Sequence, residues 1–116
     1  LNDILALPDG FDTRVGDNRT LRFTPGFMTG LALTRALLRD APLLLLDEPG
    51  ASLDEASDRV LMQQLSRLRG RRTIIMVTHR PSHVRLADKA VYMQGGGIGY
   101  FGEPEKVLAL LLEKAA

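Results

Sequence analysis

The stretch LLLLDEPGASLD, residues 43–54, decides the fold class. Its four leucines are typical of a short strand that is buried on both faces of a parallel sheet. Two carboxylates, Asp47 and Glu48, end the apolar run. Acidic groups at the mouth of a buried strand are costly unless they bind a cation or take part in acid–base chemistry. The stretch therefore predicts a central strand that ends in a reactive site.

Helical and strand-like patterns alternate along the rest of the chain. Asp54 can cap the helix that follows the stretch, and Gly70 can end it. In the last helix, Val107, Leu108 and Leu111 are expected to face inward. The pattern predicts an α/β fold, with a parallel sheet, flanking helices, and a C-terminal β-hairpin and helix. The expected helices span 25–39, 54–69 and 104–114, with a short one near Ser82, and the expected strands span 43–47, 73–78, 89–94 and 98–101.

Composition limits the classes of protein that fit. The chain has 116 residues, which suits one small domain or a piece of a larger one. Its 15 basic and 14 acidic residues give a net charge of +1, which argues against a nucleic-acid partner. It has no cysteine, so disulfides and thiolate metal sites are excluded. The apolar stretch at 41–46 is far too short to span a membrane.

The second strand adds a histidine to the same edge of the sheet. TIIMVTHR, residues 73–80, places His79 at a strand end, where parallel α/β sheets bind ligands. Asp47 could hold Mg²⁺ through water, and Glu48 could orient or deprotonate a water molecule. The alternative is a capped strand end with solvated carboxylates and a surface histidine. The combination of three such groups favours the site. His83 is expected on the surface.

The motifs LLLLDEP, GASLD and TIIMVTHR closely resemble the nucleotide-binding domain of ABC transporters, and the likeness extends over nearly the whole chain. The resemblance implies a Walker B strand at 43–47. It implies that Asp47 lies on the Mg²⁺ side and that Glu48 is the general base of ATP hydrolysis. It also implies that His79 is the switch histidine, which reaches the γ-phosphate.

Two further family motifs follow from the resemblance. A D-loop is implied at 52–54, with Ser52 and Asp54 at the seam of a dimer of nucleotide-binding domains. The family's Leu-Ser-Gly-Gly-Gln signature, which contacts the ATP held by the partner subunit, aligns with FTPGF at 23–27. Thr24 keeps a hydroxyl and Gly26 is identical.

The other signature positions are altered. Pro25 supplies no N–H, and Phe27 replaces an amide. Thr24 remains a good N-cap and Pro25 a good first helical residue, so a helix can still start here. We expect an impaired or altered phosphate contact. The alternative is an ordinary capped helix with no phosphate role.

Neither a G-x-x-x-x-G-K-[ST] phosphate loop (Walker A) nor the family's Q-loop occurs in the chain, which begins with Leu1 rather than Met. The chain is therefore expected to be the C-terminal portion of an ABC ATP-binding domain. Residues 1–40 would end the helical subdomain, and 41–116 would carry Walker B, D-loop, switch histidine and the end of the core. The missing P-loop strand is expected between the strands at 73–78 and 89–93.

The resemblance implies an ATPase that uses ATP and Mg²⁺ and powers export at the cytoplasmic face of a bacterial inner membrane. The segment at 7–18 resembles the exporter loop that touches transmembrane coupling helices, although Arg14 stands where Glu is usual. The implied partners are a second nucleotide-binding domain, the transmembrane domains and the missing N-terminal half. The chain alone is expected to be inactive. Two alternatives stay open: a non-catalytic dimerisation half of a heteromeric ATPase, and a soluble ABC-type ATPase.

Overall fold

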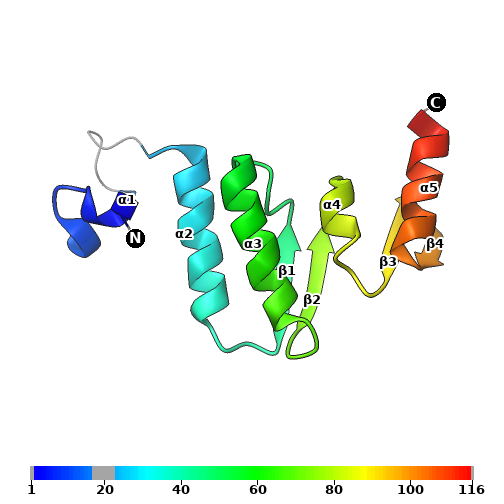
Figure 1. Ribbon diagram of the computed structural model, residues 1–116, viewed down its shortest axis with the longest axis horizontal. Coiled ribbons are helices and arrows are strands. Elements are labelled where there is room, and N and C mark those ends of the chain that lie inside the picture. The colour runs from blue at the N-terminus through cyan, green and yellow to red at the C-terminus, as the bar shows by residue number, and fades with distance from the viewer. Residues whose placement is uncertain (1, 17–22, 116) are drawn as a thin grey trace.

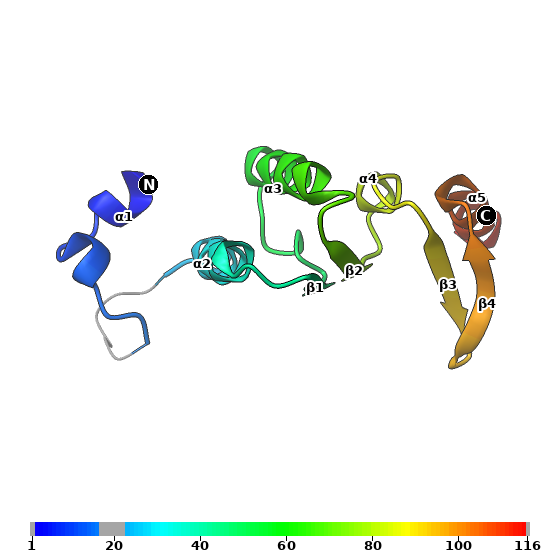
Figure 2. The ribbon, with the colours of Figure 1, turned by 90° about the horizontal axis from the view of Figure 1, so that it is seen from below.

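The computed structural model describes residues 2–16 and 23–115. The elements lie in a row 49 Å long and 26 Å across at its thinnest (Figures 1 and 2). Positions 17 and 18, the end of the exporter-like segment, lie outside the described residues. In chain order the elements are α1 (Asn2–Leu5), η1 (Gly10–Asp12), α2 (Pro25–Leu38), β1 (Leu43–Asp47), α3 (Glu55–Leu68), β2 (Thr73–Val77), α4 (Pro81–Val84), β3 (Ala90–Gln94), β4 (Gly97–Gly102) and α5 (Pro104–Ala115).

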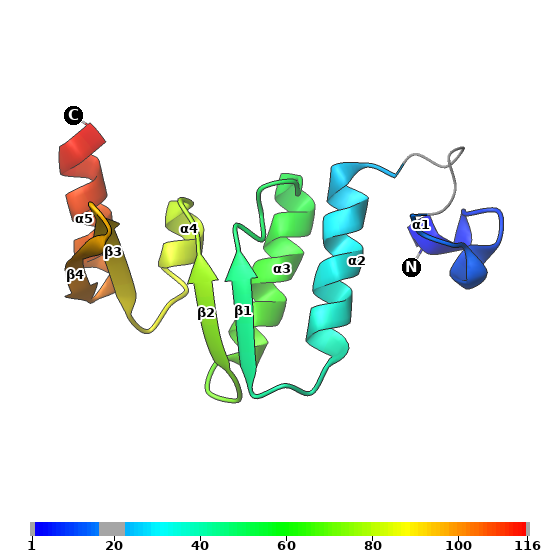
Figure 3. The ribbon, with the colours of Figure 1, turned by 180° about the vertical axis from the view of Figure 1, so that it is seen from behind.

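The central unit is a βαβ arrangement. Strands β1 and β2 are parallel, in a register that pairs Leu43 with Thr73 and Asp47 with Val77. Helix α3 covers one face of this two-stranded sheet, and α2 lies alongside β1 (Figures 2 and 3). The core beneath them is formed by Leu44, Leu46, Leu61 and Leu65, with Leu33, Ala36, Leu37, Leu53, Met62, Ile74 and Met76 packed around it. The parallel sheet and the helices predicted for this part of the chain are confirmed.

The opposite face of β1 and β2 is bare, which corrects the prediction of a strand buried on both faces. Burial alternates along β1, so that Leu44 and Leu46 are buried while Leu43 and Leu45 are exposed. Leu45 is 67% exposed. Ile75 and Val77 of β2 are exposed on the neighbouring strand. The apolar run is longer than one covered face requires, because nothing in the described part of the chain packs on the second face.

The C-terminal module is a hairpin under a helix. Strands β3 and β4 are antiparallel and joined by Gly95 and Gly96, which both have positive φ, as a two-residue type I′ turn requires. Val107 and Leu108 of α5 are buried as predicted, but Leu111 is 38% exposed. The hairpin and helix are confirmed. Among the described strands, β3 pairs with β4 alone, so β1–β2 and β3–β4 form two separate pairs, with the gap where the P-loop strand was expected (Figure 2).

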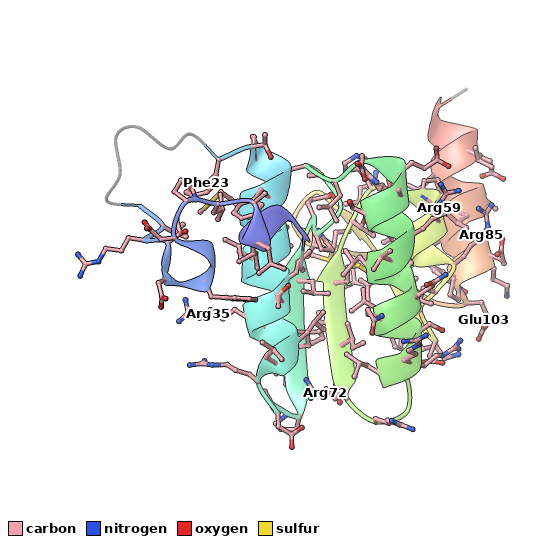
Figure 4. All side chains as sticks on the ribbon, turned by 60° about the vertical axis from the view of Figure 1, so that its left-hand side comes forward. Phe23, Arg35, Arg59, Arg72, Arg85 and Glu103 are labelled. Atoms are coloured by element: carbon pink, nitrogen blue, oxygen red, sulfur yellow. The ribbon has the colours of Figure 1, made fainter. Side chains whose placement is uncertain are left out.

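Side-chain hydrogen bonds hold both ends of α2: the C-terminal end is bonded to Arg72, next to β2, and the start is capped within the helix. At its C-terminal end, Arg72 donates to the carbonyl of Arg39 at 2.8 Å and to the Asp40 carboxylate at 3.0 Å. At its start, the Thr24 hydroxyl accepts from the backbone N–H of Phe27. Figure 4 shows Phe23 and Arg72 at these two opposite ends of the helix. Among the described residues, no helix is long and apolar enough to cross a membrane.

Candidate functional site

The carboxyl ends of β1 and β2 meet at one edge of the sheet. Because the strands are parallel and Asp47 is in register with Val77, the residues that follow each strand emerge side by side. The backbone N–H of Glu48 continues the ladder by donating to the carbonyl of Val77 at 2.9 Å. Asp47, Glu48 and His79, which we call the strand-end cluster, therefore come together although they are far apart in sequence.

Glu48 has an uncommon backbone conformation. It is the one non-glycine residue with positive φ in the described part of the chain, at 43°. For a residue with a Cβ this left-handed conformation costs about 1–3 kcal/mol, and such strain is found most often at functional sites. Here it turns the chain sharply after β1, so that the carboxylate stays at the edge of the sheet.

The Glu48 carboxylate bonds directly to the imidazole of His79. The distance from Oε1 to Nδ1 is 2.8 Å. A carboxylate can only accept, so the Nδ1–H of His79 is the donor and Nε2 is left available to another group. The His79 side chain is 77% exposed and that of Glu48 33% exposed. Both predicted catalytic residues are thus in contact with each other and open to a ligand.

Asp47 lies next to this pair and is exposed. Within the described residues its side chain forms no hydrogen bond or ion pair. No group of three or more His, Cys, Asp or Glu side chains in this part of the chain could form a metal cage. Mg²⁺ commonly uses one or two carboxylates together with water and substrate phosphates. A single free carboxylate fits that mode of binding and does not fit a dedicated protein cage.

The loop from Pro49 to Asp54 connects the cluster with α3. Pro49 and Gly50 are buried, whereas Ser52 is exposed. Asp54 is the N-cap of α3, and its Oδ1 accepts from the backbone N–H of Ser57 at 2.8 Å. This hydrogen bond lowers the pKa of Asp54 below its usual value. The side chain of Asp54 therefore caps α3, while that of Ser52 is exposed.

The first turn of α2, residues 23–27, is capped as predicted but carries few groups suited to an anion. The Thr24 hydroxyl is used by the N–H of Phe27 at 3.2 Å. The rings of Phe23 and Phe27 stack with centroids 5.0 Å apart. Gly26 lies against the D-loop candidate, since a Cβ at this position would be 2.8 Å from the backbone oxygen of Ser52. Close packing against the Ser52 backbone therefore explains why this position is a glycine.

A buried polar layer lies behind the cluster and was missed by sequence reasoning. His83, expected on the surface, is 1% exposed and bonds to Asp58 through Nε2 at 2.9 Å. Arg80 also pairs with Asp58, at 3.2 Å. One signal in the sequence pointed this way: Asp58 falls on the same helical stripe as the buried Leu61 and Leu65. A carboxylate on an apolar stripe needs a buried partner.

The chain is similar in sequence and in structure to known ABC proteins. The chain is 40% identical, over 93% of its length, to the heterocyst differentiation ATP-binding protein HepA of Nostoc, and 39% identical, over 90%, to an ATP-dependent lipid A-core flippase of Legionella pneumophila. A solved structure of a bacterial Atm1-family ABC exporter with ATP bound superposes with a TM-score of 0.81 at 26% identity over 99% of the chain. The chain is a homologue of ABC transporter ATP-binding proteins.

The likeness to ABC proteins is confined to a part of each relative. The chain spans 18% of the length of both curated relatives and 21% of the exporter chain. No protein-family model matches it. The α/β arrangement and the structural match are those of a partial P-loop NTPase fold, as predicted.

Proposed function

We propose that this chain is part of the ATP-hydrolysing nucleotide-binding domain of an ABC exporter. The main support is the 2.8 Å contact between the Glu48 carboxylate and the His79 imidazole, at the carboxyl ends of two parallel strands. This edge is where open α/β sheets bind their ligands. The ATP-binding relatives and the ATP-bound exporter support a nucleotide as that ligand.

In the proposed reaction a water molecule attacks the γ-phosphate, and each residue has a separate task. Glu48 accepts a proton from the water, for which a partly exposed carboxylate with one oxygen bonded to His79 is suited. His79 is held by Glu48 through Nδ1, so its Nε2 can steady the transferred group. In phosphoryl transfer, catalysis comes mostly from positioning and charge stabilisation. The strained backbone of Glu48 supports the same assignment.

The residues at the strand ends also fit a bound Mg²⁺. Asp47 is exposed and unpaired among the described residues, and would hold the ion through water. When bound, Mg²⁺ would neutralise charge on the phosphates of ATP. Asp47 would contribute one negative charge to its site and leave Glu48 free for the proton.

The bare face of the sheet supports the proposal that more of the same domain packs here. The two strands carry an exposed apolar face formed by Leu43, Leu45, Ile75 and Val77. Among the described strands, none pairs with β2 on its side toward β3. We infer that the P-loop strand and Q-loop segment of the full-length protein occupy this region. The complete domain would then join a second nucleotide-binding domain and transmembrane domains at the cytoplasmic face of a membrane.

The first turn of α2 favours a second candidate function. Its aromatic pair and its proline replace groups that would donate to a phosphate. The chain would then support ATP bound at its own strand-end cluster and fail to complete the site of its partner. In a heteromeric transporter this gives one competent and one impaired site, and Thr24 and Gly26 would serve the fold of the helix rather than ATP.

The proposed function is tested by Glu48→Gln in the full-length protein. Glutamine keeps the shape and hydrogen bonding of the side chain but removes the base, so ATP binding should persist while turnover falls by on the order of a hundredfold or more. Phosphate release and calorimetry measure the two quantities. Glu55→Gln, an exposed glutamate at the start of α3, is the matched control and should leave turnover unchanged. Normal turnover in Glu48→Gln would refute the proposed function.

A further inference from the structure

The candidate catalytic histidine lies between two residues that are both tied to one buried network. Thr78 and Arg80 flank His79 in sequence. The Thr78 hydroxyl is 3.3 Å from Nδ1 of His83, and the Arg80 guanidinium is 3.2 Å from the Asp58 carboxylate. His83 Nε2 and Asp58 Oδ1, 2.9 Å apart, close the connection. We call these four residues, Thr78, His83, Asp58 and Arg80, the His83 network.

The hydrogen bonds of the His83 network form one consistent chain. Asp58 can only accept, so the Nε2–H of His83 donates to it. Nδ1 of a neutral imidazole then accepts from the Thr78 hydroxyl, which itself accepts from the backbone N–H of Arg80 at 3.1 Å. The Arg80 guanidinium balances the charge of Asp58. Every group is satisfied, which is the condition under which a buried polar network holds a unique geometry.

The same network touches the loop that carries Glu48. Gly50, two residues after Glu48, has no room for a side chain: a Cβ there would be 2.4 Å from Oδ1 of Asp58 and 2.7 Å from Cε1 of His83. The backbone after β1 and the backbone after β2 therefore both pack against the His83 network. Their side chains, Glu48 and His79, meet just beyond it.

We propose that the His83 network positions the Glu48–His79 pair for catalysis, with His83 and Thr78 as positioning residues that do not touch ATP. This inference rests on the proposed function for the reaction that the pair performs. Its physical basis is that the His79 side chain is largely exposed and forms one hydrogen bond among the described residues, so its backbone must be fixed from behind. Small misplacements of a reacting group can cost up to roughly a hundredfold in rate.

The obvious variant, His83→Ala, would leave a buried carboxylate without its imidazole partner and is expected to unfold the protein. Thr78→Val is the sharper change, because it keeps the branched shape and removes only the hydroxyl. In the full-length protein we expect Thr78→Val to lower kcat by roughly 10- to 100-fold while KM for ATP stays within about twofold, since positioning is lost and binding is not. Thr78→Ser, which restores the hydroxyl, should recover most of kcat.

Two further measurements separate positioning from a general loss of stability and from failure of the proposed function. Ser82→Ala, the matched control, removes an exposed hydroxyl outside the network and should leave kcat unchanged. A crystal structure of Thr78→Val should show His79 Nδ1 displaced from its 2.8 Å contact with Glu48 Oε1, a readout that needs no turnover. Retention of that contact, or equal kcat in Thr78→Val and Thr78→Ser, would overturn the inference. Normal turnover in Glu48→Gln would instead overturn the proposed function and leave the structural readout valid.

Discussion

The strand-end cluster and the first turn of α2 are both predicted to contact ATP, yet they are built in opposite ways. In the cluster, polar side chains converge and are backed by a buried network: Glu48 meets His79 at 2.8 Å, and His83 lies behind them. In the turn, two aromatic rings stack on each other and the one side-chain hydroxyl, of Thr24, is used for capping. The first arrangement can perform acid–base chemistry, and the second mainly starts a helix.

This difference teaches that two candidate ATP-contacting regions of one chain, which would serve two different ATP sites, need not be equally suited to the contact. A strained backbone conformation such as that of Glu48 persists only where the surrounding structure fixes it, and such strain is typical of functional sites. Gly26, the one signature position identical to the family pattern, is accounted for by its contact with the Ser52 backbone. The turn can therefore keep its glycine without keeping a phosphate contact.

The largest expected effect concerns ATP binding by residues 1–116 alone. Neither region contains a phosphate cradle, so we predict no specific Mg-ATP binding and a Kd weaker than about 1 mM, which corresponds to less than about 4 kcal/mol. Isothermal titration calorimetry of the chain measures this, with the full-length protein as the positive control. A micromolar Kd for residues 1–116 would mean that the strand-end cluster holds nucleotide by itself, and that the missing P-loop does not matter.

A smaller effect is expected from repairing the turn in the full-length protein. Pro25→Gly returns a backbone N–H, and Phe27→Gln returns a side-chain amide and breaks the aromatic stack. A hydrogen bond to a charged group contributes about 1.5–3 kcal/mol. If one such bond acts fully in the transition state, the rate rises roughly tenfold, because 1.36 kcal/mol is about tenfold. Phosphate-release assays should therefore show higher turnover in the double variant.

The repaired turn needs two controls. Glycine in the first helical turn costs up to about 1 kcal/mol of helix stability, so turnover is compared at equal folded fraction, measured by circular dichroism. Met28→Gln adds an amide to the same turn at an exposed neighbouring position and should not raise turnover. Unchanged turnover in a well-folded double variant would mean that the turn is not a degraded signature.

The smallest effect is expected at Asp54, at the end of the loop between the strand-end cluster and α3. Its folded pKa lies below the usual 3.8 because it accepts the Ser57 backbone N–H. Its contribution to stability is therefore fully present above about pH 4 and is lost as the pH falls through the folded pKa. Asparagine is also a good N-cap, so the difference should be small. At neutral pH we expect Asp54→Asn to be slightly less stable than the unchanged chain.

The pH dependence of this small difference is the test. Thermal unfolding of residues 1–116 and of Asp54→Asn, followed from pH 7 to strongly acid pH, should show the two midpoints converging as Asp54 is protonated. The exposed pairs of Arg69 with Asp88 and of Lys89 with Glu103 titrate in both chains, so their effect cancels in the comparison. A constant difference at all pH values would show that the capping bond does not depend on the charge of Asp54.

Much of the local structure was predictable from the sequence, because it depends on neighbours. Asp54 and Thr24 cap their helices by bonds to residues three positions on. Gly95 and Gly96 make the hairpin turn. The apolar runs mark β1 and β2, and the acidic and histidine residues that end them mark the candidate site. The family resemblance rested on the same short motifs.

The tertiary structure alone decided which of these side chains bond to each other and which are buried. The Glu48–His79 contact joins residues 31 positions apart, and the Asp58–His83 contact joins residues 25 positions apart. No local spacing encodes such distances, so His83 was placed on the surface by sequence reasoning and found in the interior. Burial also depends on what packs against a residue. Leucines 43 and 45 have the same side chain as 44 and 46, yet only the second pair is buried, because α3 covers one face of the sheet and α2 adds side chains to the core on that face.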